Sequence, residues 1–245
     1  MEKTLIIVPT YNEIEVISSL ITTIFAHNVA VDVLVVDDNS PDGTATAVTE
    51  MMGEYSKRLF LEVRPEKMGL GIAYTFGFKW ALKRQYQYIF EMDADLSHDP
   101  KEINSMNNLL ASSCDVVVGS RYLNGVNVVN WPLGRILLSY FASMYVRLIT
   151  GMPIKDATAG FVGYRRSVLE KIDLDAIRFV GYAFQIEMKY KAWLQKFTIQ
   201  EHPIIFVNRE LGKSKMDKKI IWEAMFGVLY LRIKNNLAWL QRKHS

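Results

Sequence analysis

The 245-residue sequence has a single cysteine, Cys114, and four histidines without metal-ligand spacing. One cysteine excludes a disulfide framework and a multi-cysteine zinc site. The longest charge-free apolar stretches, 136–146 and 224–231, are shorter than the roughly 18 residues of a membrane-spanning helix. An apolar signal-peptide core is also missing, because the run 5–8 ends at Pro9. The composition, 50% hydrophobic and 22% charged, indicates a globular protein.

Positive charge is concentrated at one end of the chain. Residues 209–245 hold nine Lys/Arg against three Asp/Glu, although the net charge of the whole chain is only +3. This bias indicates either an anionic partner, such as a phosphate ligand or a lipid surface, or a solvated helix face. The basic residues do not form a long stripe, so we expect no nucleic-acid partner.

Short β-branched runs alternate with helical patterns through the first half of the chain. The runs 5–8, 33–36, 59–63, 88–92 and 116–118 predict strands, and their continuous apolar character is typical of a parallel sheet covered on both faces. Asn12, Asp42 and Asp99 are candidate caps of the intervening helices. Later segments predict helices over 132–150, 183–196 and 216–242 and a strand over 199–207. We therefore expect an α/β fold with a mainly parallel sheet.

Acidic residues follow two of these predicted strands. Asp37 and Asp38 end one strand, and Asp93 and Asp95 follow another. If the chain stays extended through 93–95, the two outer carboxylates share a face. A hard cation, Mg²⁺ or Mn²⁺, would balance carboxylates that meet in one crevice. The alternative is that these acids cap the following helices.

Glycines and cations provide phosphate-binding features. Lys67 precedes Gly69 and Gly71 at the start of a helical pattern, where a phosphate or ribose could approach the backbone. Further cations follow strands or lie in glycine-containing loops, and together they favour a phosphate-lined site: Arg121, Arg135, Arg209, Lys213 and Lys215.

The order of these motifs resembles that of a known family. The segments are PTYNE (9–13), VDDNSPDGT (36–44), KMGLG (67–71), MDADLSH (92–98), GSRY (119–122), NWP (130–132), DATAGF (156–161) and RELGKSK (209–215). They resemble the polyprenyl-phosphate mannosyltransferases, or dolichol-phosphate mannose synthases, of glycosyltransferase family 2. The resemblance covers residues 4 to about 215. Each motif is weak alone, but the combination is specific.

The resemblance implies a GT-A fold, Rossmann-like, over 1–215, and roles for particular residues. Asp95 would bind the metal, with Ser97 as a second ligand directly or through water, since some relatives have Gln at this position. The proposed catalytic residues are Asp95, Arg121 and Arg135. The proposed nucleotide-sugar and phosphate contacts are Pro9, Tyr11, Glu13, Val36, Asp38, Lys67, Asp93, Ala94, Arg121, Arg209 and Lys215.

The implied reaction is metal-dependent, inverting transfer of mannose from GDP-mannose to a polyprenyl phosphate. Three alternatives stay open: a UDP-glucose donor, a sugar-hydroxyl acceptor with Asp156 as the nearest candidate base, or a non-catalytic nucleotide-sugar-binding subunit. We expect a peripheral protein on the cytoplasmic face of a membrane, with the membrane surface or a membrane protein as partner. The amphipathic extension 216–245 would either lie in the lipid interface or pack on its own domain.

Overall fold

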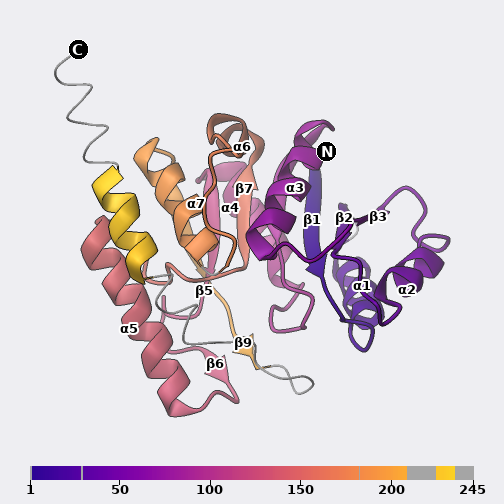
Figure 1. Ribbon diagram of the computed structural model, residues 1–245, viewed down its shortest axis with the longest axis horizontal. Coiled ribbons are helices and arrows are strands. Elements are labelled where there is room, and N and C mark those ends of the chain that lie inside the picture. Colours follow the sequence, from indigo (N-terminus) through magenta and orange to yellow (C-terminus); the bar gives the residue numbers. More distant parts are fainter. Residues whose placement is uncertain (1, 29, 182, 209–224, 235–245) are drawn as a thin grey trace.

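The computed structural model describes residues 2–28, 30–181, 183–208 and 225–234 (Figure 1). The first half alternates strands and helices: β1 (Lys3–Thr10), α1 (Ile17–His27), β2 (Val31–Asp37), α2 (Thr44–Met51), β3 (Leu59–Val63), α3 (Leu70–Leu82) and β4 (Tyr86–Glu91). The second half contains α4 (Glu102–Ser112), β5 (Val116–Ser120), β6 (Val128–Val129), α5 (Leu133–Thr150), β7 (Val162–Arg165), α6 (Arg166–Lys171), α7 (Ala183–Leu194), β8 (Ile199–Pro203) and β9 (Phe206–Val207).

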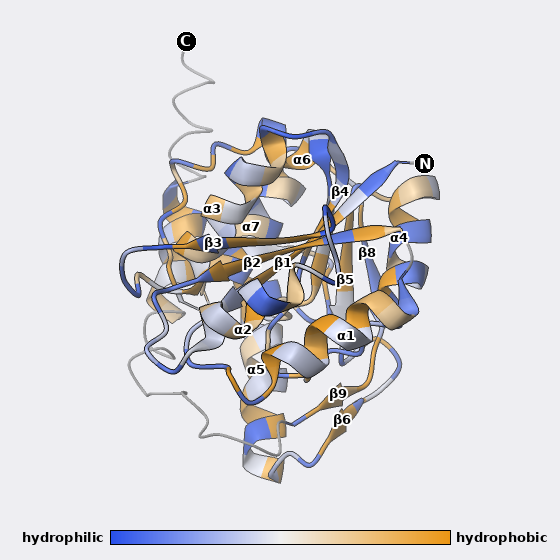
Figure 2. Cartoon of the chain, turned by 90° about the vertical axis from the view of Figure 1, so that its right-hand side faces the viewer, coloured by the Kyte–Doolittle hydropathy of each residue, from blue (hydrophilic) through white to orange (hydrophobic). Residues whose placement is uncertain are grey.

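A seven-stranded sheet forms the centre, in the order β3-β2-β1-β4-β7-β5-β8. Strands β1 to β4 are mutually parallel, β5 and β8 pair in parallel, and β7 runs antiparallel between β4 and β5. One face packs on α3, α6 and α7, and the other on α1, α2 and α4 (Figure 2). The predicted, mainly parallel sheet flanked by helices is confirmed. The short antiparallel strand β7 was not predicted.

The first helix begins later than its sequence pattern suggests. Asn12 is not its cap, because α1 starts at Ile17 after Val16. Asn12 instead adopts a positive φ of 59°, and its N–H donates to Ser40 Oγ. Asp42 and Asp99 each accept an N–H from two residues further on, in the turns before α2 and α4, but the capping residues of these helices are Gly43 and Lys101.

The predicted strand over 199–207 is wrong as one element. Strand β8 ends at Pro203 and pairs with β5, whereas β9 begins at Phe206 and pairs with β6 in a separate two-stranded sheet. The break at 204–205 lets the chain change partner. Ile204 remains buried and joins the core on the α1 face of the large sheet.

Residues 225–234 form a helical segment, as predicted for this region. Val228 and Leu231 pack against side chains of α5 and α7, and the Tyr145 hydroxyl of α5 donates to Met225 O at 3.0 Å. Phe226 and Ile233 are exposed. The rest of the predicted helix, the proposed boundary at 215/216, Arg209, Lys213 and Lys215 lie outside the described residues. In the described ranges, no helix is long and apolar enough to span a bilayer.

Close packing at Gly163 of β7 gives a test of the fold. A Cβ at this position would lie 2.5 Å from Cε1 of the fully buried Phe90 ring. We expect Gly163→Ala to lower the free energy of unfolding by about 1–3 kcal/mol through overpacking. Urea unfolding measures the change. The control Gly134→Ala places its Cβ in open space and should be near neutral. Equal stability of both variants would contradict the packing.

Candidate active site

The carboxyl ends of β1, β2 and β4 open at one edge of the sheet. Thr10 is in register with Asp37, and Ile7 is in register with Glu91. Because these strands are parallel, the loops that follow them emerge side by side. The predicted nucleotide, sugar and metal residues at 9–13, 36–38 and 93–97 therefore gather in one region.

The loops after β1 and β2 are tied together. The Glu13 N–H donates to Thr44 Oγ1, and the Ile14 N–H donates to Asp42 Oδ2, both at 3.1 Å. Asp37 is buried and accepts the Thr10 hydroxyl at 2.7 Å and the Ser40 N–H at 2.8 Å. The Asp37 carboxylate thus links the loops after β1 and β2, and the hydrogen bonds that it accepts come from within the protein.

Asp38 forms a buried ion pair with Arg64, a residue that the sequence analysis missed. Arg64 Nε donates to Asp38 Oδ1 at 2.6 Å, and both side chains are buried. The missed signal is an arginine directly after β3, whose carboxyl end lies beside that of β2. The pair compensates the Asp38 charge in the predicted nucleoside region.

Other predicted nucleoside residues are brought close together. Lys67 Nζ lies 4.1 Å from the centroid of the Tyr11 ring, a cation–π contact between two predicted binding residues. Pro9 and Val36 are register partners on β1 and β2. The Val36 side chain is fully buried in the core, so it can shape the floor of this region.

The acidic segment after β4 turns instead of remaining extended. Ala94 and Asp95 lie in a turn, and Leu96 has a positive φ of 60°, so the predicted shared strand face is wrong. Asp95 Oδ1 accepts the Ser97 N–H at 3.1 Å. Asp93 Oδ1 accepts the Tyr74 hydroxyl at 3.2 Å. Burial and the Asp93 charge raise the pKa of Tyr74 well above its usual value, so the hydroxyl stays a donor.

The residues of this turn fit a hard divalent ion. Asp93 and Asp95 are partly exposed, whereas Ala94 and Ser97 are buried. Within the ranges that the structure describes, no group of three or more acidic, His or Cys side chains forms a metal cluster. Mg²⁺ and Mn²⁺ tolerate such a sparse oxygen donor set, because water and substrate phosphates complete their coordination.

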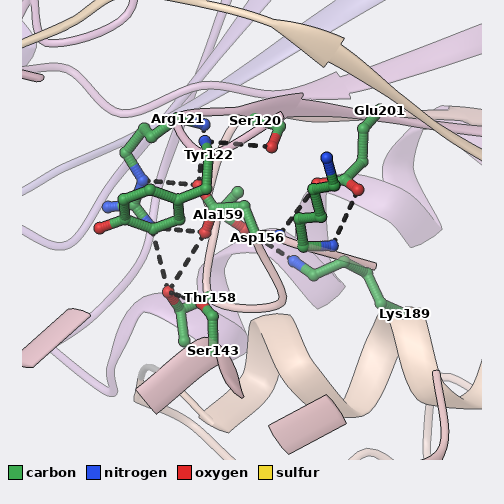
Figure 3. A network of polar contacts seen from close by, with 10 residues as sticks. Ser120, Arg121, Tyr122, Ser143, Asp156, Thr158, Ala159, Lys189 and Glu201 are labelled. Carbon is green, nitrogen blue, oxygen red and sulfur yellow. Dashed lines mark hydrogen bonds and ion pairs between the residues drawn. The ribbon is translucent and has the colours of Figure 1, made fainter. Parts of the chain in front are cut away.

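On the other side of the sheet edge, Arg121 is held by Asp156. Arg121 Nε and Nη2 donate to the two carboxylate oxygens of Asp156, each at 2.7 Å, and Nη2 also donates to Thr158 Oγ1 at 3.0 Å (Figure 3). The Arg121 backbone N–H adds a bond to Asp156 Oδ2 at 3.0 Å. This bidentate arrangement fixes the plane of the guanidinium.

Arg135 of α5 lies next to Arg121 around one aromatic ring. The guanidinium carbons of Arg135 and Arg121 lie 4.2 and 5.5 Å from the centroid of Trp131. Arg135 Nη1 also donates to Asn208 Oδ1 at 2.9 Å. The two predicted catalytic arginines therefore share one wall of the site.

Asp156 is not built to act as a general base. Burial raises its pKa, but the charge and hydrogen bonds of Arg121 outweigh burial and lower the pKa below its usual value. A base at neutral pH needs a pKa near 7. His98 does not provide one either: it stacks on Phe161, and burial lowers its pKa to about 4.

The sequence model of the family "Glycosyl transferase family 2" matches residues 5–173. The chain belongs to glycosyltransferase family 2. The family match covers the strands from β1 to β7, the acidic turn and the Arg121–Asp156 pair, and it identifies the protein as a glycosyltransferase.

Two curated relatives resemble this glycosyltransferase over most of its length. A polyprenol monophosphomannose synthase of Mycolicibacterium smegmatis is 44% identical, over 96% of this chain and 89% of the relative. An undecaprenyl-phosphate mannosyltransferase of Micrococcus luteus is also 44% identical, over 92% of each chain.

Solved structures share the GT-A fold at low identity. Glucosyl-3-phosphoglycerate synthase of Mycobacterium tuberculosis, in complex with phosphoglyceric acid, aligns with a TM-score of 0.69 and 14% identity, over 94% of this chain and 79% of that one. A mannosyltransferase of Pyrobaculum calidifontis in complex with GDP-mannose and Mn²⁺ aligns with a TM-score of 0.60 and 17% identity, over 93% and 69%. These likenesses establish the fold alone.

The Arg121–Asp156 pair predicts a loss of stability that depends on pH. Asp156→Asn removes the charge that compensates a buried guanidinium, so we expect unfolding to become easier by about 3 kcal/mol at neutral pH. Because the folded-state pKa of Asp156 is lowered, its contribution is complete above the unfolded pKa and disappears as pH falls through the folded one. The difference from wild type should therefore shrink in acid.

Chemical unfolding at several pH values from neutral to acid measures this trend. The matched control is Asp175→Asn, which removes the partner of Lys79 in an exposed ion pair and should cost less than about 1 kcal/mol. A pH-independent difference for Asp156→Asn would contradict the assigned charge state.

Proposed function

We propose that this glycosyltransferase transfers mannose from GDP-mannose to a polyprenyl phosphate, with inversion at the anomeric carbon. The observation that carries the proposal is the pair Arg121 and Arg135 around Trp131, at the start of a helix with an exposed apolar face. This placement suits an acceptor with an anionic head and an apolar chain. The names of the two curated relatives agree with such an acceptor.

A phosphate acceptor agrees with the absence of a suitable base among the described residues of this wall. A phosphate monoester has a second pKa near ~6, so it is mostly dianionic at neutral pH and is itself the nucleophile. Arg121 and Arg135 would bind and orient this group, and Asp156 would hold Arg121 in place. A sugar-hydroxyl acceptor would instead need a base, which the buried, paired Asp156 does not supply.

The donor would bind across the other loops. Tyr11, Glu13, Asp38 and Lys67, on the floor formed by Pro9 and Val36, would hold the nucleoside, while Asp93 and Ala94 would line the sugar and diphosphate. Asp95, with Ser97 directly or through water, would hold Mg²⁺ or Mn²⁺. A divalent ion bound there would neutralise charge on the leaving diphosphate. The acceptor phosphate would attack from the opposite face of the sugar, so an α-linked donor would give a β-linked product.

The apolar face of α5 supports a membrane surface as partner. Leu137, Phe141, Met144 and Leu148 recur at helical spacing and are 41–76% exposed. Leu133 precedes them and is 70% exposed. Arg135 lies near the start of the same helix but about half a helical turn away from this face, so the phosphate of a lipid in contact with the face would have to pass the start of α5 to reach the two arginines. Placement on the cytoplasmic face stays a prediction.

Removing the proposed metal ligand tests the reaction. We expect Asp95→Ala to reduce mannosyl transfer about a hundredfold or more, because charge on the leaving group would no longer be compensated. Purified protein is incubated with labelled GDP-mannose, GDP-glucose or UDP-glucose, a short polyprenyl phosphate, and Mg²⁺ or Mn²⁺. Label entering an organic extract measures transfer.

Glu50→Ala, an exposed change on α2, is the control and should keep full activity. A folded, fully active Asp95→Ala would refute the metal assignment. If wild type transfers label from UDP-glucose alone, the donor assignment is wrong. If it labels no lipid with any donor, the proposed reaction is wrong.

Membrane contact is tested on the α5 face. We expect Leu137→Gln/Phe141→Gln/Leu148→Gln to weaken binding to vesicles of phosphatidylglycerol and phosphatidylcholine at least about tenfold, since three apolar side chains no longer enter the lipid. Vesicle sedimentation measures binding. Val63→Gln replaces an equally exposed apolar residue on β3 and should bind as wild type. Unchanged sedimentation of the triple variant would exclude this face.

A further inference from the structure

A lysine in the middle of α7 has a fully buried side chain. Lys189 is 0% exposed, although lysine is among the residues least often found in protein interiors. Its Nζ donates to the carbonyl oxygen of Ala159 at 2.7 Å (Figure 3). A buried ammonium group is tolerated only with compensating charge and hydrogen bonds, so its surroundings indicate what it does.

Two carboxylates compensate the Lys189 charge, one on each side of the site. Burial lowers the pKa of Lys189, and Glu91 followed by Asp156 oppose this shift most strongly. Glu91, at the end of β4, is also fully buried. Burial raises the pKa of Glu91, and among the groups that oppose this shift Lys189 comes first. Glu91 lies two residues before Asp93, and Asp156 holds Arg121.

The backbone atom that Lys189 binds belongs to the segment between these two parts of the site. In residues 156–160, Asp156 and Thr158 contact the Arg121 guanidinium. At the other end, a Cβ on Gly160 would lie 3.5 Å from Asp93 Oδ2, so the backbone passes close to that carboxylate. Ala159 lies between these contacts, and its carbonyl accepts the hydrogen bond by which Lys189 of α7 holds the segment.

We propose that Lys189 is a positioning residue of the glycosyltransferase: its hydrogen bond to Ala159 O holds the segment 156–160 so that Arg121 and Asp93 face each other across the reacting groups. This inference rests on the proposed function, in which Arg121 binds the acceptor and Asp93 lines the donor. Lys189 keeps the Arg121 guanidinium at a fixed place relative to Asp93. Lys189 itself touches neither substrate.

A purely structural role must be separated from positioning. Lys189→Met alone leaves the Glu91 carboxylate buried without its main compensating charge, and loss of stability would follow in either case. The double variant Glu91→Gln/Lys189→Met removes both ionisable groups, so we expect its unfolding midpoint to recover toward wild type. The double variant still lacks the hydrogen-bond donor to Ala159 O. Only a positioning role therefore predicts that its kcat stays low and its amide exchange stays fast.

The experiment compares wild type, Lys189→Met, the double variant and the control Lys191→Met. Lys191 is the neighbouring lysine of α7 and contacts Ala176 O and Glu187 outside the segment 156–160. Measured are the unfolding midpoint, binding of GDP-mannose, kcat and KM for a short polyprenyl phosphate, and amide hydrogen exchange over 119–123 and 156–161.

For the double variant, we expect kcat to fall about 10–100-fold with donor binding within a few-fold of wild type, as misplacement of a catalytic group predicts. Exchange should accelerate at the Arg121 amide, which donates to Asp156, and over 156–160. Lys191→Met should match wild type in kcat and in hydrogen exchange.

Normal kcat and normal exchange in a stable double variant would overturn the proposal. In a double variant no more stable than Lys189→Met, exchange over 156–160 that matches wild type would overturn it as well. If wild type transfers no mannose, the proposed function fails separately, and exchange over 156–160 still decides the positioning role.

Discussion

Parallel pairing of β1, β2 and β4 is the constraint on which the site depends. It brings the loops after these strands to one sheet edge, and with them a concentration of carboxylates. Such a concentration is unfavourable through both repulsion and desolvation. The fold compensates it with buried cations from other elements: Arg64 after β3 pairs with Asp38, Arg121 after β5 pairs with Asp156, and the charge of Lys189 on α7 opposes the raised pKa of Glu91.

This compensation separates two kinds of acidic residue that are indistinguishable in the sequence. Asp38 and Asp156 are buried in ion pairs with arginines, and burial raises the pKa of Glu91, a shift that Lys189 opposes. Asp93 and Asp95 lie partly exposed in the turn after β4, where a substrate or ion can approach. The metal proposal therefore rests on the second kind, and the first kind shapes the site around it.

The strands were predictable because their signal is local. Continuous apolar runs such as 33–36 mark strands that are buried on both faces, and each agrees with a strand of the sheet to within a few residues. Elements set by tertiary contacts were not predictable. Asn12 has the composition of a helix cap, but its backbone is held by the loop after β2. The run 199–207 has the pattern of one strand in the sequence, yet two different sheets divide it.

For the site, the sequence motifs located the acidic turn and the arginines but not their partners. A lysine in a helix, such as Lys189, has the pattern of a surface residue, and only the packing of α7 against β4 and the segment 156–160 buries it. From the sequence alone, Asp156 is a candidate general base. Its ion pair with Arg121, which excludes that role, is visible only in the structure.

That pairing bears directly on the chemistry. An enzyme that activates a neutral hydroxyl needs a carboxylate with a raised pKa, whereas one that binds a phosphate nucleophile needs a cation held in a fixed plane. Asp156 and Arg121 have the second arrangement: the carboxylate's pKa is lowered, and both of its oxygens orient the guanidinium. If the arginine lay away from the carboxylate, the same two residue types would suit an enzyme that activates a hydroxyl. The geometry of this pair therefore favours an anionic acceptor, independently of the names of the relatives.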